Sequence, residues 1–323
     1  MEYTQLGRSG LRVSRLCLGT MNFGVHTEEA EAHRILDAAL DAGVNFVDTA
    51  DLYGWPERPG LTETVIGNWL ARGGGRRERT VLATKVYSDM GDWPNEGGLS
   101  ALHIRRAVEA SLRRLRTDHI DLYQMHHVDR STPWDEVWQA MDVLVTQGKI
   151  VYVGSSNFAG WHLAEAQESA RARHLPGLVS EQSHYNLLER TVELEVVPAA
   201  RRYGIGLLPW SPLHSGLLAG VLRDERRGVR RTVARAAAAL ARRRPQIQEY
   251  EDLAAELGQE PGHVALAWLL ANPAVTAPVV GPRTLEQFHS ALAALEVELE
   301  PKALARLDEI FPGHRPAPEA YAW

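Results

Sequence analysis

The chain of 323 residues predicts an α/β fold, a (β/α)8 TIM barrel that forms a single domain over residues 1–323. Three observations lead to this prediction. Eight short apolar or β-branched runs follow one another, segments with helical spacing lie between them, and the chain length suits one such barrel. The eight runs are Leu16–Gly19, Asn45–Asp48, Val81–Lys85, Ile120–His126, Ile150–Ser155, Leu178–Gln182, Gly206–Pro209 and Val275–Val280.

An open doubly wound sheet is the alternative that fits the same alternation of strands and helices. Such sheets commonly bind dinucleotides through a G-x-G-x-x-G turn after a strand, and no such turn follows any of the eight runs. The nearest approach is Gly204-Ile205-Gly206, which continues into Leu-Leu-Pro. The closed barrel is therefore the preferred prediction.

Turn residues and periodicity predict elements outside the eight runs. Residues Tyr3–Ser14 predict an N-terminal hairpin, because two short alternating segments flank the turn cluster Gly7–Gly10. Two later segments have the clearest helical spacing of apolar residues. One contains Trp134, Val137, Trp138, Met141, Leu144 and Val145, and the other contains Ile104, Val108, Leu112 and Leu115.

A long insertion, Trp210–Gly262, follows the seventh run. It contains the arginine- and alanine-rich segment Arg223–Arg244 and then Pro245–Leu257. The alanines favour an inserted helix. The arginines indicate either its solvated face, the more common case, or a site for an anionic partner. An insertion at this place is expected on the C-terminal face of the barrel, where it can cover a ligand.

The C-terminal tail, Phe311–Trp323, is rich in proline and aromatic residues. Because proline lacks a backbone N–H group, we expect no regular structure in this tail. We also expect Tyr321 and Trp323 to pack near the pocket, since large aromatic side chains are unusual in a floppy terminus.

Composition excludes several classes of protein and site. The formal net charge of -6 argues against nucleic acid as a partner. The single cysteine, Cys17, lies in an apolar run and excludes an internal disulfide and a multi-cysteine zinc site. Met1–Gly10 is too polar for a signal peptide, and runs such as Val264–Leu270 are too short to span a bilayer. We therefore expect a cytoplasmic protein with no membrane partner; nothing indicates its oligomeric state.

Polar residues follow most of the eight runs. The second run ends at Asp48 and is followed by Tyr53, an acid and a phenol that together suggest proton chemistry. The later runs lead into Thr84-Lys85, Met125-His126-His127, Ser155-Ser156-Asn157, Glu181-Gln182, Pro209-Trp210-Ser211-Pro212 and Gly281-Pro282-Arg283. Each, taken alone, has a structural explanation such as a helix cap or a packed core side chain. Their convergence on the C-terminal face of a barrel predicts a catalytic site.

These motifs resemble those of the aldo-keto reductase family over nearly the whole chain. The matching segments are Asp-Thr-Ala-Asp-Leu-Tyr-Gly (48–54), Ala-Thr-Lys (83–85), Asp-Leu-Tyr-Gln-Met-His (121–126), Gly-Ser-Ser-Asn-Phe (154–158), Gln-Ser-His-Tyr-Asn-Leu-Leu (182–188), Trp-Ser-Pro-Leu (210–213) and Gly-Pro-Arg (281–283). Phe-Pro-Gly-His (311–314) and the tail after it resemble bacterial members linked to deoxysugar ketoreduction, and relatives of that branch reduce aryl aldehydes.

The resemblance implies an oxidoreductase that reduces a small-molecule carbonyl substrate with a nicotinamide cofactor, without a metal. It implies a catalytic tetrad of Asp48, Tyr53, Lys85 and His126. By the same resemblance, Ser156, Asn157 and Gln182 hold the carboxamide, and Trp210 stacks on the nicotinamide. The remaining cofactor residues implied are Ser211, Pro212, Leu213, Gly216 and Leu217 near the pyrophosphate, and Gly281, Arg283 and Gln287 at the adenosine end.

The chemistry of carbonyl reduction suits the four implied catalytic residues. The alkoxide formed after hydride transfer needs a proton, which Tyr53 can donate, although a free phenol has a pKa of about 10. A Lys85 ammonium lowers that pKa, and Asp48 keeps the ammonium charged. A neutral His126 can donate a hydrogen bond to the carbonyl oxygen. His127 is predicted to take no part, because adjacent strand residues face opposite sides of the sheet.

Arg283 predicts NADPH as the cofactor. It stands where a helix begins, and its guanidinium can bind the ribose phosphate that distinguishes NADPH from NADH. The chain departs from many relatives of the family at Ser290-Ala291, where they place Glu-Asn. A side-chain contact to adenine is therefore not expected there, and cofactor affinity is expected to depend more on Arg283 and Gln287.

Three other functions were weighed against carbonyl reduction. A short-chain dehydrogenase needs Tyr-x-x-x-Lys, which the chain lacks. A metal-dependent barrel hydrolase needs more strand-end ligands than His126 and Asp48. A regulatory protein similar to potassium-channel β-subunits remains possible on this fold. The substrate is predicted only coarsely, by the candidate aromatic pocket residues Trp55, Tyr87, Trp93, His127 and Trp323, as an aldehyde or ketone of aromatic or sugar-like bulk.

Overall fold

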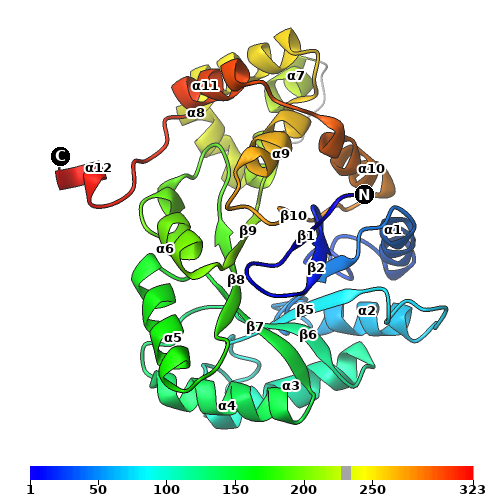
Figure 1. Ribbon diagram of the computed structural model, residues 1–323. Helices are drawn as coiled ribbons and strands as arrows, with labels where there is room; N and C mark the ends of the chain where they lie inside the picture. The colour runs from blue at the N-terminus through cyan, green and yellow to red at the C-terminus, as the bar shows by residue number, and fades with distance from the viewer. Residues whose placement is uncertain (227–233, 323) are drawn as a thin grey trace.

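Eight parallel strands close into a barrel in the computed structural model, which describes residues 1–226 and 234–322 (Figure 1). Their order around the barrel is β10-β3-β4-β5-β6-β7-β8-β9, and the predicted fold class is confirmed. The strands are β3 (Cys17–Gly19), β4 (Phe46–Asp48), β5 (Val81–Val86), β6 (Ile120–Met125), β7 (Ile150–Ser156), β8 (Leu178–His184), β9 (Gly206–Trp210) and β10 (Val279–Val280).

The last strand is shorter than its apolar run predicts. Only Val279–Val280 forms β10, and it pairs with β9 at one position, where Val279 is opposite Trp210. Val275 makes an isolated bridge to Leu207 instead. Pro278 lies within this run and Pro282 lies just after it, and a proline donates no ladder hydrogen bond.

The predicted hairpin closes the N-terminal end of the barrel (Figure 1). Its strands are β1 (Tyr3–Gln5) and β2 (Arg12–Ser14), paired antiparallel. Leu6 and Val13 are fully buried against the inward-facing side chains of the barrel. Gly7 has a φ of +56°, and a Cβ there would collide with the backbone at Gly204. The turn therefore requires glycine in order to sit this close to the barrel.

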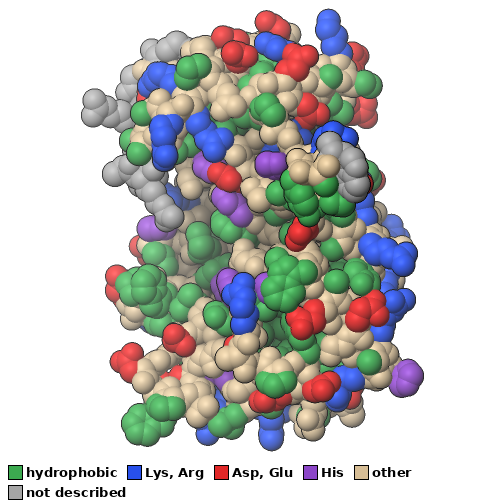
Figure 2. Space-filling model, turned by 90° about the vertical axis from the view of Figure 1, so that its left-hand side faces the viewer, with side chains coloured by type: hydrophobic (Ala, Val, Ile, Leu, Met, Phe, Trp, Pro, Cys, Tyr) green, Lys and Arg blue, Asp and Glu red, His purple; other side chains and the backbone are tan. Residues whose placement is uncertain are grey.

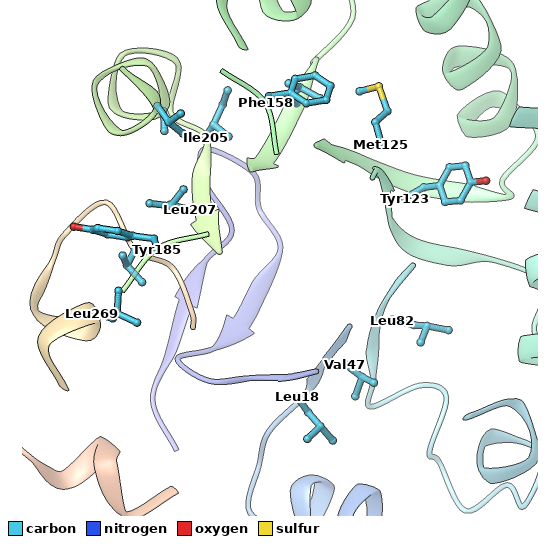
Figure 3. Packing of buried hydrophobic residues seen from close by; sticks show 14 of the residues in the cluster. Leu18, Val47, Leu82, Tyr123, Met125, Phe158, Tyr185, Ile205, Leu207 and Leu269 are labelled. Atoms are coloured by element: carbon cyan, nitrogen blue, oxygen red, sulfur yellow. The ribbon is translucent and has the colours of Figure 1, made fainter. Parts of the chain in front are cut away.

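Helices surround the barrel and cover the outward side chains of the strands. They are α1 (Glu29–Asp41), α2 (Leu61–Leu70), α3 (Ala101–Leu115), α4 (Trp134–Thr146), α5 (Gly160–Ala172), α6 (Val196–Tyr203), α7 (Val221–Arg226), α8 (Ala234–Glu256), α9 (Pro261–Ala271), α10 (Leu285–Ala293), α11 (Pro301–Ile310) and α12 (Glu319–Ala322). Leu18, Val47 and Leu82 point outward from three adjacent strands into this layer (Figure 3). Their neighbours Cys17, Phe46 and Ala83 belong to the inner cluster, as the strand period of two requires.

The two helices with clear periodicity occur as predicted, with one exception. The apolar face of α3 is buried, as are Val137, Trp138 and Met141 of α4. Val145 is 42% exposed, although its spacing put it on the buried face. Val145 lies in the last turn of α4, which ends at Thr146.

The long insertion after β9 contains the expected helix. Helix α8 runs from Ala234 to Glu256 and passes through Pro245, which the sequence suggested as the start of a separate segment. It buries Leu240, Ile247 and Tyr250, and so forms part of the core. Arg243 and Arg244 pair with Glu189 and Glu225, which supports the solvated-face interpretation for these two arginines. The arginine-rich residues 227–233 lie outside the described residues.

The tail differs from both expectations. Residues Glu319–Ala322 form the short helix α12, which begins just after Pro318, a residue suited to the first turn of a helix. The tail is attached at Leu194, whose carbonyl accepts a hydrogen bond from the Ala317 N–H group at 2.8 Å. Beyond this point it extends away from the barrel, and Tyr321 is 76% exposed (Figure 1). Trp323 lies outside the described residues. None of the described helices could cross a membrane.

Candidate active site

Asp48, Tyr53, Lys85 and His126 come together at the C-terminal ends of β4, β5 and β6. The Lys85 ammonium donates hydrogen bonds to Asp48 Oδ2 at 2.6 Å, to the Tyr53 hydroxyl at 3.1 Å and to the Thr49 carbonyl at 2.9 Å. The His126 ring meets the Tyr53 ring edge to face, with centroids 6.0 Å apart. The sequence placed these four residues on neighbouring strand ends, and the structure gives them mutual contact.

Strand register explains why the group assembles. Asp48 is opposite Ala83, and Lys85, two residues further along β5, is opposite Gln124. Asp48 and Lys85 therefore both face the barrel interior, where the lysine stem can reach the aspartate. Tyr53 follows a turn closed by the hydrogen bond from its N–H group to the Ala50 carbonyl at 3.2 Å, which returns its ring over Lys85.

Burial and charge fix the protonation states of the group. Burial alone would lower the pKa of Lys85, but Asp48 and Tyr53 together raise it above its usual value. Burial, the positive charge of Lys85 and His127 lower the pKa of His126 to about 3. Lys85 is therefore charged and His126 neutral near pH 7, as the chemistry of the motif led us to expect.

The pKa of Tyr53 differs from the sequence-based expectation. Burial raises it by more than the Lys85 ammonium lowers it, so the net shift is upward. The expected lowering is thus only one contribution among several. The consequence is that Tyr53 holds its proton firmly in this state and releases it only to a strong base such as an alkoxide.

Two glutamine amides complete the coordination of Asp48. Gln124 Nε2 and Gln182 Nε2 donate to Asp48 Oδ1 at 2.8 and 2.9 Å. No role was assigned to Gln124 from the sequence alone. Gln124 lies two residues before His126, so the two positions share one face of the strand. Gln182 was predicted to hold a carboxamide, and in this structure its amide nitrogen instead contacts the carboxylate. Both oxygens of the buried carboxylate therefore accept hydrogen bonds.

Ser156, Asn157 and Trp210 form a chain of contacts that begins at His126. Asn157 has a φ of +60° and its amide nitrogen donates to the His126 carbonyl at 3.1 Å. Its Oδ1 accepts from Trp210 Nε1 at 3.0 Å. His184, which the sequence did not single out, stacks on Trp210 with centroids 4.2 Å apart and planes at 11°. One face of the indole is thus covered, and a nicotinamide ring could stack only on the other.

The loop after β9 contains four residues with a positive φ. Ser211, His214 and Ser215 have φ values of 53°, 45° and 55°, and Gly216 has a φ of 91°. Such left-handed residues turn the backbone sharply. Leu217 is 1% exposed, so its side chain packs in the core and is not available to a ligand.

Arg283 stands exposed at the N-terminal end of α10. Thr284 caps this helix by accepting the Gln287 N–H group at 3.3 Å. The Gln287 side chain in turn accepts the Arg283 N–H group at 2.8 Å. Gly281 is held by the Asn22 amide, which donates to its carbonyl at 2.9 Å. A helix N-terminus beside a guanidinium is an environment that favours a phosphate group.

A family model for the "Aldo/keto reductase family" matches residues 15–311. The chain belongs to the aldo/keto reductase family. It is 56% identical to the "Uncharacterized oxidoreductase YrpG" of Bacillus subtilis (strain 168) over 329 residues, which cover all of both chains. It is 34% identical to the "Versiconal hemiacetal acetate reductase" of Aspergillus parasiticus, with 98% of this chain and 100% of that protein covered. A "Probable voltage-gated potassium channel subunit beta" of Oryza sativa subsp. japonica is also 34% identical, over 99% and 100% of the two chains.

A pocket of about 490 Å³ in this aldo/keto reductase has walls that neighbour Tyr53 and Lys85 along the chain. Its walls are Leu52, Trp55, Tyr87, Ser88, Asp89, Gly98, Asp129 and Ser131. Of the aromatic residues predicted for a pocket, Trp55 and Tyr87 line it, and His127 lies against the Tyr87 ring at 5.4 Å. Trp93 is 77% exposed and does not line it. Figure 2 shows a hollowed face of the molecule along which histidine and hydrophobic side chains gather.

Glu181 is a buried acid that the sequence did not connect with the site. It is fully buried and accepts hydrogen bonds from the Ser155 hydroxyl at 2.5 Å, the Ser183 hydroxyl at 2.7 Å and the Phe158 N–H group at 3.1 Å. Burial raises its pKa to about 7, although these hydrogen bonds lower it. Because it holds the turn that carries Ser156 and Asn157, its ionisation is coupled to the geometry of that turn.

Glu181 should make the protein less stable as the pH rises from about 4.5 to about 7. In this window the folded state keeps a proton that the unfolded state has lost, so the free energy of unfolding falls with pH, by at most about 3 kcal/mol. Urea unfolding of wild type and Glu181→Gln at pH 5 and pH 7 measures this. The variant should lack that part of the decrease, whereas the exposed-site control Glu165→Gln should retain it. Equal pH slopes for all three proteins would contradict the assignment.

Proposed function

We propose that this aldo/keto reductase reduces an aldehyde or ketone to an alcohol, with NADPH as hydride donor and Tyr53 as proton donor. The observation that carries the proposal is the contact of the Tyr53 hydroxyl with Lys85, whose charge is maintained by Asp48. A phenol that is buried beside a fixed ammonium is a proton donor whose conjugate base is stabilised as it forms.

The residues of this chain divide the remaining tasks. A neutral His126 can donate a hydrogen bond to the carbonyl oxygen of the substrate and so orient it toward Tyr53. Gln124 and Gln182 bind Asp48, and Asp48 binds Lys85. These contacts fix the position of the ammonium group that contacts the proton donor, Tyr53. When bound, NADPH supplies the hydride.

Several features of the chain fit such a cofactor. Trp210 has one indole face uncovered by His184, and Asn157 and Ser156 lie next to it. The left-handed backbone of Ser211–Gly216 suits a pyrophosphate, because its N–H groups can turn toward an anion. At the far end, the exposed Arg283 suits the ribose phosphate of NADPH.

The direct test is turnover. The purified protein should oxidise NADPH, followed by its absorbance, in the presence of a nitrobenzaldehyde or a keto-sugar, and faster than with propanal. A regulatory or binding role is the second candidate, because relatives at 34% identity bear the name of potassium-channel β-subunits. Cofactor binding without turnover of any carbonyl compound in the panel would favour that role over catalysis.

Arg283→Ala should weaken NADPH binding by roughly ten- to a hundredfold and leave NADH binding little changed. A charged hydrogen bond contributes on the order of 1.5–3 kcal/mol, and 1.4 kcal/mol corresponds to a factor of ten. Fluorescence titration of both cofactors measures the two dissociation constants. The control Arg105→Ala removes an exposed arginine on α3 and should change neither. Equal losses for both cofactors in Arg283→Ala would show that this residue supports the loop and not the phosphate.

A further inference from the structure

The pocket beside Tyr53 has an uneven charge. Its walls include two carboxylates, Asp89 and Asp129, and none of the described residues that line it is basic. Arg130, which lies between Asp129 and Ser131 in the sequence, is exposed and does not line it, and the nearby Lys85 is fully buried in its contact with Asp48. The loop from Val86 to Ile104 adds Asp92 and Glu96 and contains no lysine or arginine.

The carboxylate of Asp129 is charged and held in place by hydrogen bonds. Burial raises the pKa of Asp129, but hydrogen bonds from Ser131, Leu99 and Thr132 outweigh it and lower this pKa to about 2. All these donors are neutral, so the negative charge is not cancelled. Asp89 is exposed at the rim, and no cation pairs with it among the described residues. The titratable neighbour His103 is no counter-charge, because burial lowers its pKa.

The backbone brings the two carboxylates to the same short segment. A Cβ at Gly97 would collide with an Asp89 carboxylate oxygen, and one at Gly98 would lie 2.9 Å from Asp129 Oδ2. Consecutive glycines therefore let both side chains approach one stretch of chain. The result is a fixed negative end to the pocket, separate from the Lys85–Asp48 pair, whose charges compensate each other.

Two of the other lining residues are aromatic and lie close to Tyr53 and Lys85 in the sequence. Trp55 and Tyr87 line the pocket, and Trp55 is 64% exposed, so much of its surface is available to a ligand. Leu52 and Trp55 flank Tyr53 in the sequence, and Tyr87 follows Lys85 by two residues. Aromatic faces combined with carboxylates form the usual environment for an organic cation.

From this combination we infer that the pocket takes carbonyl compounds that carry an ammonium group on an apolar or aromatic body, and that it rejects carboxylate-bearing ones. The carbonyl would lie at Tyr53 and the ammonium group toward Asp89 and Asp129. This inference rests on the proposed carbonyl reduction for its substrate, but the charge preference of the pocket is a separate property.

Three benzaldehydes with different para substituents test it: trimethylammoniomethyl, hydroxymethyl and carboxymethyl. The methylene group insulates the carbonyl from the charge. An exposed ion pair changes affinity by up to about fivefold, so attraction in one case and repulsion in the other should give roughly a tenfold higher kcat/KM for the cation than for the anion. Raising KCl from low concentration to about 0.5 M should reduce this ratio, because salt screens exposed charges.

The variant Asp89→Asn removes the negative charge of Asp89 and keeps a side chain of similar shape. It should lower the cation-to-anion ratio of kcat/KM by about threefold to fivefold. Asp142→Asn removes an exposed carboxylate on the outer face of α4 and should leave the ratio at the wild-type value. An unchanged ratio in Asp89→Asn would overturn the inference, as would a wild-type preference for the anion or for the hydroxymethyl compound over the cation.

A binding measurement separates this inference from the proposed function. Calorimetric titration with benzyltrimethylammonium and with phenylacetate, neither of which can be reduced, needs no turnover. Tighter binding of the cation that is lost in Asp89→Asn would support the charge preference even if none of the aldehydes were reduced. Reduction of all three aldehydes at similar rates, with equal binding of the two analogues, would support the proposed carbonyl reduction and contradict the charge preference of the pocket.

Discussion

Tyr53→Phe should reduce the kcat of carbonyl reduction by roughly 10²–10⁴-fold, the usual contribution of a positioned general acid. The substitution removes one hydroxyl and keeps the ring that packs against His126. Lys85 loses one of three acceptors and retains Asp48 and the Thr49 carbonyl. Cofactor affinity should therefore remain close to wild type.

Single-turnover kinetics with NADPH and a cofactor titration measure the two effects separately. Tyr152→Phe serves as the matched control, because it removes a phenol hydroxyl near the start of β7, away from Lys85, and should keep full activity. If Tyr53→Phe retained even a tenth of the wild-type rate, another group would have to supply the proton.

Lys85→Met should destabilise the fold by about 3–5 kcal/mol, because it leaves a buried carboxylate without its counter-charge. Lys85 is fully buried and Asp48 is 2% exposed, so water cannot replace the lost partner. Activity should fall as well, since nothing then stabilises the phenolate that forms on Tyr53.

A second variant distinguishes the two roles of Lys85. Adding Asp48→Asn to Lys85→Met removes the uncompensated charge, and urea unfolding should show recovery of most of the lost stability. Turnover should not recover with it. A loss of less than about 1 kcal/mol in Lys85→Met would indicate that Asp48 takes up a proton at little cost, and would remove the argument for a permanent ion pair.

The sequence was sufficient for the barrel and for the clustering of Asp48, Lys85 and His126 because both depend on local patterns. Strand alternation and the position of a polar residue at a strand end determine which side chains reach the mouth. That rule placed Asp48, Lys85 and His126 at neighbouring strand ends, and the family resemblance implied their roles. The apolar run that contains β10 shows the limit of this rule. The prolines within and after the run determine how many of its residues form backbone hydrogen bonds to the neighbouring strands.

Contacts between distant parts of the chain could not be predicted in the same way. Gln182 reaches Asp48 across 134 positions of sequence, and this depends on side-chain rotamers inside the closed barrel. His184 packs on Trp210 because β8 and β9 pair in one particular register. The pKa of Tyr53 required knowledge of how much burial offsets the lysine charge. The tail was misjudged because proline suits a first helical turn as well as an irregular segment.

Strands β9 and β10 pair at a single position, and Val275 adds one isolated bridge to Leu207 along the same edge. Local opening costs least where the fewest backbone hydrogen bonds must break, so we expect the barrel wall to open first at the junction between these two strands. Trp210 ends one of these strands and Arg283 follows the other. A dinucleotide that contacted both residues would bridge the junction, and its binding free energy would add to the free energy of closing the wall. Amide hydrogens of β9 and β10 would then exchange more slowly as the cofactor site filled, even where the cofactor did not touch them.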